Sequence, residues 1–418
     1  MTLSVEPPIS DWVKRLRKWL TTPTDKTSSP QVIFWFSLSL TCAALFGSIG
    51  LRRAFSHEYI VQDDARQHVF WMQRFLDPQL FPNDFIADYF QSVAQPGYKA
   101  IYQLAAAVGI DAMLFNKLLP ILLGIIATAY CFGVCMQLLP VPAAGFVSAL
   151  LLNQTLWMND DLVSGTARSF VYPLFLAFLY YLLHRSLLPC LVALALQGLL
   201  YPFVMLISAG ILVVRVVRWE AGKLKFSSDR RDYLFCATGV GITLLILLPL
   251  VLESSEYGPR ITLTEAKTMP EFEDEGRSRF FLNSVFEFWL YADRSGFFPY
   301  EWTHVLYALV LVSFGVLFLR QLRHPSHFPL VKHITSNINV LAQISVVSVG
   351  LYVAAHALLF KLYLPSRYSQ YSIRILTVFA GAIAAIVLLD AIFLRIHAQR
   401  STQQLVALAL TALLGIPL

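Results

Sequence analysis

Residues 31–51 read QVIFWFSLSLTCAALFGSIGL and contain no charged side chain. A helix needs about 20 such residues to cross the hydrocarbon core of a bilayer. This run is therefore predicted to span a membrane. Five further runs of the same character are Pro120–Leu139, Tyr233–Leu252, Val305–Leu319, Val340–Phe360 and Leu376–Leu394.

Shorter or proline-broken apolar runs lie between these long ones: Ala143–Trp157, Ser169–Leu183, Leu187–Leu200 and Tyr201–Val214. Unpaired backbone groups are prohibitively costly in lipid, so these runs are also predicted to be spanning helices. Leu405–Leu418 would begin a further span. The predicted fold is all-α, a polytopic bundle of about 10–11 transmembrane helices.

The composition excludes a water-soluble globular protein. Of the 418 residues, 57% are hydrophobic and 14% are charged, whereas a typical soluble protein has about 25% charged residues. The sequence contains no Gly-rich phosphate loop, nucleotide fingerprint or internal repeat, and no nucleic-acid partner is expected. All five cysteines fall inside predicted spans, where we interpret them as small apolar residues.

The distribution of basic residues predicts the orientation, because cytoplasmic loops carry an excess of Lys and Arg. Residues 1–30 are basic and are predicted to be cytoplasmic, and residues 31–418 form one transmembrane domain in the cell (inner or plasma) membrane. Alternating spans place the basic segments Arg215–Arg231, Arg320–Lys332 and Arg395–Arg400 inside. They place the long, more acidic loops 52–98 and 253–304 outside.

The apolar residues of the N-terminal segment recur at helical spacing opposite Lys14, Arg15, Arg17 and Lys18. An amphipathic helix of this kind suits the surface of an anionic inner leaflet. A basic topology signal without further function explains the pattern equally well.

The first outer loop is rich in aromatic residues interleaved with charges. Residues 63–76 place their apolar side chains toward one side of a helix, which predicts amphipathic helices on the membrane surface. Asp63 or Asp64 would cap the N-terminus of the first such helix. The second outer loop is acidic in its first half and aromatic in its second half, which predicts another interfacial segment.

The motif Gln62-Asp63-Asp64-Ala65-Arg66 follows the first span on the outer face. Repulsion between neighbouring carboxylates favours protonation of one of them, which suits a proton acceptor working near neutral pH. The alternative is a simple N-cap on a surface helix.

A second acidic pair, Asp160 and Asp161, is predicted to lie on the same side of the membrane. Two converging acidic pairs could hold a divalent metal ion, a sugar hydroxyl or a cation, although ordinary solvated loop acids give the same pattern. Arg168 follows at the expected depth of a lipid phosphate. Its alternative role is interfacial snorkelling.

The third outer feature is Lys361–Arg374, KLYLPSRYSQYSIR, with three cations and three tyrosines. Outer loops usually contain few cations. Arg367 and Arg374 could chelate a phosphate or diphosphate through bidentate hydrogen bonds. Pairing with the acids of the second outer loop is the alternative.

An acidic pair followed by Ala-Arg just outside the first span, and then Gln95-Pro96-Gly97-Tyr98-Lys99 opening an amphipathic stretch, resembles the C-type glycosyltransferases. That family includes the protein O-mannosyltransferases and the aminoarabinose transferases. The similarity covers roughly residues 31–139 in sequence and the rest in topology. Members use a polyprenyl-phosphate sugar as donor outside the cytoplasmic membrane.

The resemblance implies specific roles for residues of this chain. Asp63 or Asp64 would be the catalytic acid, with the position before Ala65 favoured, and Asp160 or Asp161 would match the acid of the second loop. Lys99 would contribute a cation to the donor phosphate, although the family's lysine commonly precedes the prolines. The chain also ends on an apolar run, whereas many relatives continue with more spans or a soluble domain.

The leading hypothesis is therefore an inverting hexosyl- or pentosyltransferase that moves a sugar from a polyprenyl phosphate to an unspecified acceptor. A transporter or flippase of lipid-linked saccharides is the alternative, and it would show ionisable residues at mid-membrane. His356 and Asp390 are the ionisable residues inside predicted spans, and both lie near a span end. A non-catalytic membrane scaffold is a third alternative.

Overall fold

The computed structural model describes residues 9–24, 26, 28–157, 160–220, 223–252, 256–258, 261–299 and 328–398. Helices dominate these ranges, and the predicted all-α class is confirmed. Five helical segments are long and apolar enough to cross a membrane: Pro30–Ala54, Ala112–Leu138, Arg230–Pro249, Ser336–Ala357 and Pro365–Leu394. This is the composition of a membrane protein.

The long helices are α2 (Pro30–Ala54), α6 (Ala112–Leu138), α12 (Arg230–Leu252), α16 (Asn339–Ala357) and α17 (Gln370–Ala398). The shorter runs form α7 (Pro142–Trp157), α9 (Val171–Leu183), α10 (Leu187–Leu200) and α11 (Pro202–Arg215). Each overlaps a predicted apolar run, although α6 begins at Ala112 rather than Pro120 and α17 at Gln370 rather than Leu376. The predicted spans at 305–319 and 405–418 lie outside the described residues.

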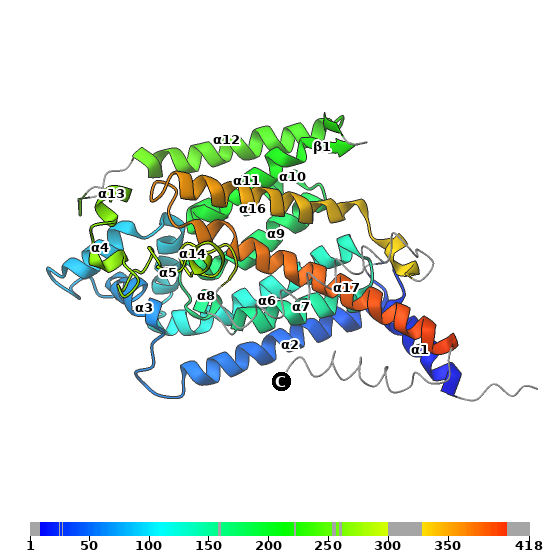
Figure 1. Cartoon of the computed structure of the whole chain (residues 1–418). Coiled ribbons are helices and arrows are strands. Elements are labelled where there is room, and N and C mark those ends of the chain that lie inside the picture. Colours follow the sequence, from blue (N-terminus) through cyan, green and yellow to red (C-terminus); the bar gives the residue numbers. More distant parts are fainter. Residues whose placement is uncertain are drawn as a thin grey trace, which may run out of the picture.

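The long helices run side by side, and the connecting elements gather at the two ends of the bundle (Figure 1). One end carries α3 (Asp63–His68), α4 (Phe85–Val93), α13 (Leu263–Ala266) and α14 (Val285–Leu290). The opposite end carries α1 (Ile9–Thr21) and the antiparallel hairpin of β1 (Val217–Glu220) and β2 (Lys223–Phe226). The described parts of the loops 52–98 and 253–304 therefore lie at the same end of the bundle.

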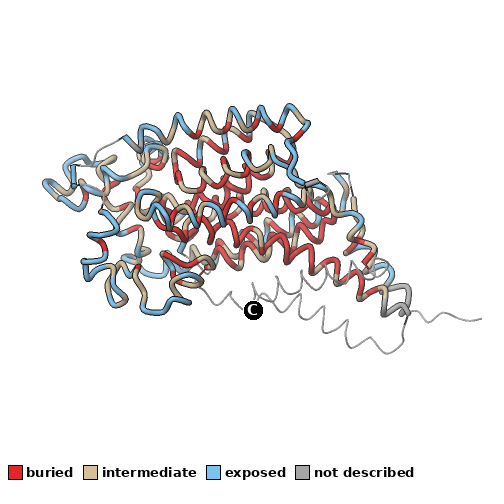
Figure 2. The backbone as a smooth tube through the Cα atoms, turned by 45° about the horizontal axis from the view of Figure 1, so that its top comes forward, coloured by how far each residue is buried: buried red, intermediate tan, exposed pale blue. Residues whose placement is uncertain are grey.

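The core lies along the central helices (Figure 2). In the most apolar part of Pro365–Leu394, which includes most of α17, 78% of the residues are buried. The corresponding share is 22% in α2 and in α12. The exposed side chains of the outer helices are themselves apolar, for example Ile49 on α2 and Leu245 on α12. Apolar faces of this kind suit contact with lipid.

Close helix packing occurs around Trp157, at the end of α7. A Cβ atom at Gly50 of α2 would lie 2.5 Å from a ring carbon of Trp157, and one at Gly124 of α6 would lie 3.1 Å away. The glycines therefore allow α2 and α6 to approach the indole closely.

The segment predicted to be the first outer loop is folded into short helices rather than extended. It comprises α3, the 3-10 helix η1 (Phe70–Phe75), α4 and α5 (Pro96–Ala107). Ala65, Val69, Trp71 and Met72 are fully buried, so this layer is anchored to the bundle through its apolar side.

The predicted cap of α3 is wrong. Gln62 is the N-cap, because its backbone is extended and its side-chain oxygen accepts a hydrogen bond from the Ala65 amide at 3.2 Å. Asp63 and Asp64 lie in the first turn instead. A carboxylate is also favourable there, because the amino end of a helix carries partial positive charge.

Candidate functional site

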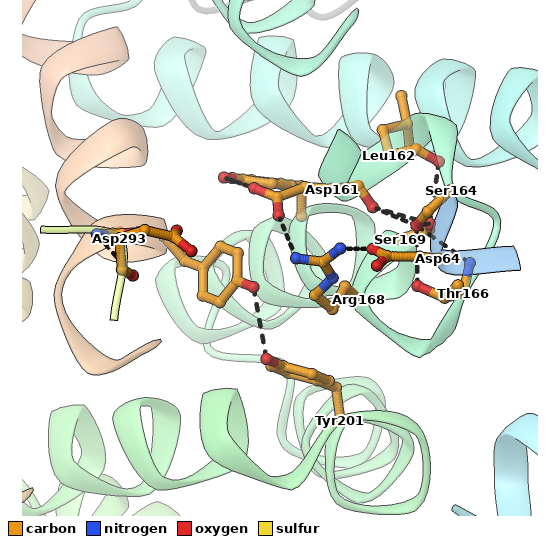
Figure 3. Close-up of polar contacts among 12 residues, drawn as sticks. Asp64, Asp161, Leu162, Ser164, Thr166, Arg168, Ser169, Tyr201 and Asp293 are labelled. Carbon is orange, nitrogen blue, oxygen red and sulfur yellow. Dashed lines mark hydrogen bonds and ion pairs between the residues drawn. The ribbon is translucent and has the colours of Figure 1, made fainter. Parts of the chain in front are cut away.

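Asp64 forms an ion pair with Arg168 (Figure 3). Asp64 comes from the first turn of α3, and Arg168 comes from the 3-10 helix η2 (Ala167–Phe170). The two side chains are 27% and 24% exposed. Both side chains are therefore partly accessible, although the paired oxygen Oδ2 of Asp64 is itself buried.

Asp161 links this pair to a second arginine. Asp161 lies in α8 (Asp160–Val163) and forms an ion pair with Arg374 of α17, and its other oxygen is 3.7 Å from Arg168 Nη1. Arg374 Nη1 also donates to the Tyr172 hydroxyl at 2.8 Å. Asp64, Arg168, Asp161 and Arg374 thus form one continuous ion-pair cluster.

The inner half of the ion-pair cluster is buried. The Asp161 and Arg374 side chains are 10% and 6% exposed. Two charges at this depth are retained only when each compensates the other. This inner pair is suited to holding the loop and Arg168 in place rather than to contacting a ligand.

Buried hydrogen bonds fix the loop that carries Arg168. Ser169 Oγ donates to the carbonyl oxygens of Asp161 and Leu162 at 2.8 and 2.9 Å. Asn116 Nδ2 donates to the Ser164 carbonyl at 2.7 Å, and Tyr102 OH donates to the Gly165 carbonyl at 2.8 Å. Burial raises the pKa of Tyr102 to about 12, so its hydroxyl remains a neutral donor.

Gly165 makes the turn of this loop possible. Its φ is +60°, and a Cβ atom there would lie 2.3 Å from Asn116 Nδ2. Only glycine adopts this backbone conformation readily and also leaves room for the amide. The position of Arg168 is therefore determined by the backbone of the loop as well as by its ion pair.

Arg367 lies beside the ion-pair cluster without joining it. It belongs to the 3-10 helix η7 (Pro365–Tyr368), and Tyr371, Tyr201 and Asp293 lie within electrostatic range of its guanidinium. Tyr371 is also within electrostatic range of Asp161 and Arg168, so it lies between Arg367 and the cluster. The Tyr371 hydroxyl is 3.4 Å from that of Tyr201.

Arg367 is a cation without a hydrogen-bonded counter-ion in the described part of the chain. Its side chain makes no ion pair there, and its Nε atom is buried without a hydrogen-bond partner. A buried donor that lacks a partner costs free energy, about 1–3 kcal/mol. An anionic ligand would recover that cost.

The second outer loop packs onto η7 and brings Asp293 close. The Ser366 amide donates to the Arg294 carbonyl at 3.3 Å, and Tyr352 OH donates to the carbonyl oxygens of Trp289 and Ser295 at 2.8 and 2.9 Å. Asp293 itself is exposed. The alternative prediction was that acids of this loop pair with the cations of Lys361–Arg374. Among the described residues of the loop, Asp293 lies near Arg367 but forms no ion pair with it.

The structure separates the remaining predicted site residues from the ion-pair cluster. Asp63 and Asp160 are exposed and make no ion pair with any described residue, so each acidic pair contributes one member to the cluster. Lys99 is partly buried on α5 and likewise has no described ionic partner. Arg374, predicted as a phosphate ligand, is already engaged by Asp161 and Tyr172.

Sequence reasoning missed Tyr172 and Tyr201. Each lies near the start of an apolar run. Its hydroxyl, a polar group in an otherwise apolar segment, could have indicated a place in the site. As for the metal alternative, no group of three or more His, Cys, Asp or Glu side chains able to hold a metal ion occurs within the described ranges.

Comparison with protein-family models, with curated proteins and with solved structures gave no match. The resemblance to C-type glycosyltransferases therefore remains a prediction from the motif around Asp64 and the segment Gln95–Lys99.

Proposed function

We propose that the chain is a membrane glycosyltransferase that moves a sugar from a polyprenyl-phosphate donor to an acceptor on the extracytoplasmic face. The observation that carries the proposal is the junction of Asp64, Arg168 and Asp161 in one cluster beside Arg367, which makes no ion pair with any described residue. In this proposal the bundle has ten or eleven spans, about as many as its apolar runs. Its N-terminus is cytoplasmic and it lies in the cell (inner or plasma) membrane.

The donor phosphate is assigned to Arg367. A guanidinium matches the geometry of a phosphate and can bind it through two parallel hydrogen bonds. Lipid-facing helices surround the site, so an isoprenoid tail attached to that phosphate has an apolar environment to occupy. Low local polarity strengthens the contact between the two charges.

Asp64 is assigned as the general base of an inverting transfer. Its carboxylate accepts the proton of the acceptor hydroxyl while the hydroxyl oxygen forms a bond to the anomeric carbon of the sugar. The bond from that carbon to the phosphate oxygen breaks, and the electron pair leaves with polyprenyl phosphate. Arg367 stabilises the negative charge of the departing phosphate.

Arg168 links the two halves of this mechanism. In the structure it is paired with Asp64, which leaves the proposed base occupied. A donor phosphate would compete for the guanidinium of Arg168 and so release Asp64 for the acceptor. Asp161 acts as a positioning residue, because it lies against Arg168 and not the reacting atoms, and Arg374 holds Asp161 in place.

The transporter alternative is supported less well. A transporter of charged substrates carries ionisable residues near mid-membrane. The charges of the proposed site gather instead at the end of the bundle that holds α3 and α14, and the Arg17–Asp390 pair lies at the opposite end. If the protein were a non-catalytic scaffold, Asp64→Ala should leave its function intact.

The test is mass spectrometry of envelope glycans and lipid-linked sugars in cells that lack the gene and are complemented with variants. Wild type and Asp63→Asn should restore every lost product, whereas Asp64→Asn should restore none and should leave the donor accumulated. The two variants are matched, because they remove the same charge from adjacent residues. Full restoration by Asp64→Asn, at equal protein abundance, would refute the proposal.

A further inference from the structure

A cavity of about 510 Å³ lies at the end of the bundle opposite the ion-pair cluster. It is formed where α1, the linker after it and the 3-10 helix η5 (Pro329–His333) meet the last turns of α17. The described residues that line it are Lys14, Arg17, Lys18, Thr21, Thr22, Pro23, Pro329, Leu330, His333, Asp390 and Phe393. We call it the basic cavity.

One side of the basic cavity is held together by Asp390. Arg17 Nε donates to Asp390 Oδ1 at 2.8 Å, and Thr21 Oγ1 donates to the same oxygen at 2.9 Å. The Asp390 side chain is 3% exposed. These bonds attach α1 to α17, and they account for the single carboxylate among the lining residues.

The lining is rich in cations. Arg17 and Lys18 lie in it with one acid, Asp390, and Lys14 and His333 add further nitrogen atoms. Among the described residues Arg17 donates only through its Nε atom, so both Nη groups can donate to a ligand. Lys18 makes no ion pair with any residue in the described ranges. This set of donors selects an anion with several acceptor oxygens, such as a phosphate group.

The surroundings of the cavity are apolar. Leu330 and Phe393 form part of its wall, and Trp19 of α1 packs against Phe34 and Trp35 of α2 with ring centroids 4.9 and 4.6 Å apart. Tryptophans are enriched where a helix bundle meets the headgroup region of a bilayer. An anion bound here would therefore sit at headgroup depth.

We propose that the basic cavity binds the phosphate headgroup of an anionic phospholipid, with Lys18 and the Nη groups of Arg17 as the principal donors. A lipid is favoured over a free phosphate, because the cavity joins a basic lining to the apolar ends of membrane helices. Basic pockets and helices at the cytoplasmic surface are suited to such lipids. Binding would reinforce the attachment of α1 to α17. The proposal needs only the membrane location, and it is independent of the transferase reaction.

The test is thermal unfolding of the purified full chain in mixed micelles that contain phosphatidylglycerol, phosphatidylcholine or inorganic phosphate. Phosphatidylglycerol should raise Tm by about 2–4 °C, because a ligand that binds only the folded state stabilises it. Phosphatidylcholine and inorganic phosphate should leave Tm unchanged. The variant Lys14→Gln/Lys18→Gln should lose the shift.

Arg15→Gln/Lys26→Gln is the matched control. It removes the same number of positive charges from exposed positions of the same segment that do not line the cavity, and it should keep the shift. Equal stabilisation by both lipids, an equal effect of inorganic phosphate, or an equal loss in the control would each overturn the proposal. Asp64→Asn should retain the full shift, which separates this result from the fate of the proposed transferase activity.

Discussion

The carboxylate of Asp161 lies against two arginines, Arg168 and Arg374, and the two arginines differ in how deeply they are buried. Arg374 is buried with Asp161, whereas Arg168 is shared between Asp161 and the more accessible Asp64. A buried pair holds the structure, and a partly exposed pair is better placed to exchange partners. The structural and the proposed chemical roles are therefore carried by neighbouring residues of one cluster.

Removing Arg374 tests the structural role. Arg374→Met should lower the free energy of unfolding by about 3–5 kcal/mol, because it leaves Asp161 as a buried charge without its closest partner. Chemical unfolding in micelles measures the loss, and the double variant Asp161→Leu/Arg374→Met should recover much of it. Arg279→Met is the control: its ion pairs with Asp274 and Glu287 are exposed, so it should cost about 0–1 kcal/mol. Equal losses for the two arginine variants would contradict this role.

The sequence identified the charged members of the site one by one, but it did not identify their pairing. Asp64 and Arg168 are distant along the chain, and nothing local to either residue specifies the other. Arg374 was expected to face a ligand because its neighbours are basic and aromatic. Its true partner comes from a loop more than half the chain away, which only the packing of α17 reveals.

The segment predicted to be the first outer loop contains only short helices, and side-chain hydrogen bonds hold these helices together. Arg74 of η1 donates to the carbonyl oxygens of Leu80 and Phe81 at 3.1 and 2.5 Å, and to Asp88 and Gln91 of α4 at 2.6 and 2.9 Å. The guanidinium of Arg74 thus links η1 to α4 and to the turn between them. The aromatic pattern predicted helices here, but it did not predict the residue that joins them.

Arg74→Ala should release this loop. Its loss removes four hydrogen bonds, so hydrogen exchange in residues 77–93 should rise while the long helices keep their protection. Arg66→Ala is the control, because Arg66 is exposed on α3 and makes no ion pair with any described residue. Unchanged exchange in Arg74→Ala would show that other contacts hold the loop.

The same layer should respond to pH through His68. Burial lowers the pKa of His68, and its ring packs edge-on against Phe90 at 5.1 Å. An unfolded imidazole titrates near pH 6.5, so as pH falls the unfolded loop takes up a proton before the folded loop does. Stability is therefore complete above about pH 6.5 and decreases below it. Thermal unfolding between about pH 7.5 and pH 5 should show this loss in the wild type and not in His68→Phe. An identical pH dependence in the two proteins would contradict it.

In the whole molecule, the connecting elements form a layer at each end of the helix bundle. Apolar helices fill the space between a polar layer of α3, α4, α13 and α14 and an opposite layer of α1 and the β1–β2 hairpin. Hydrophobic run length alone predicted the helices, because each must satisfy its own backbone in lipid. The hairpin was not predicted, since its strands, Val-Arg-Trp-Glu and Lys-Leu-Lys-Phe, alternate over only four residues each.

The central claim is that Arg367 supplies the donor-phosphate site beside Asp64. It is tested most directly by the binding of polyprenyl phosphate to the purified protein, because that product carries no sugar and leaves the sugar's identity out of the measurement. Wild type and Lys361→Gln, which removes an exposed cation of the same loop, should bind alike. Arg367→Gln should bind at least about tenfold more weakly, as expected for the loss of a charge-assisted contact. Wild-type affinity in Arg367→Gln would contradict the account.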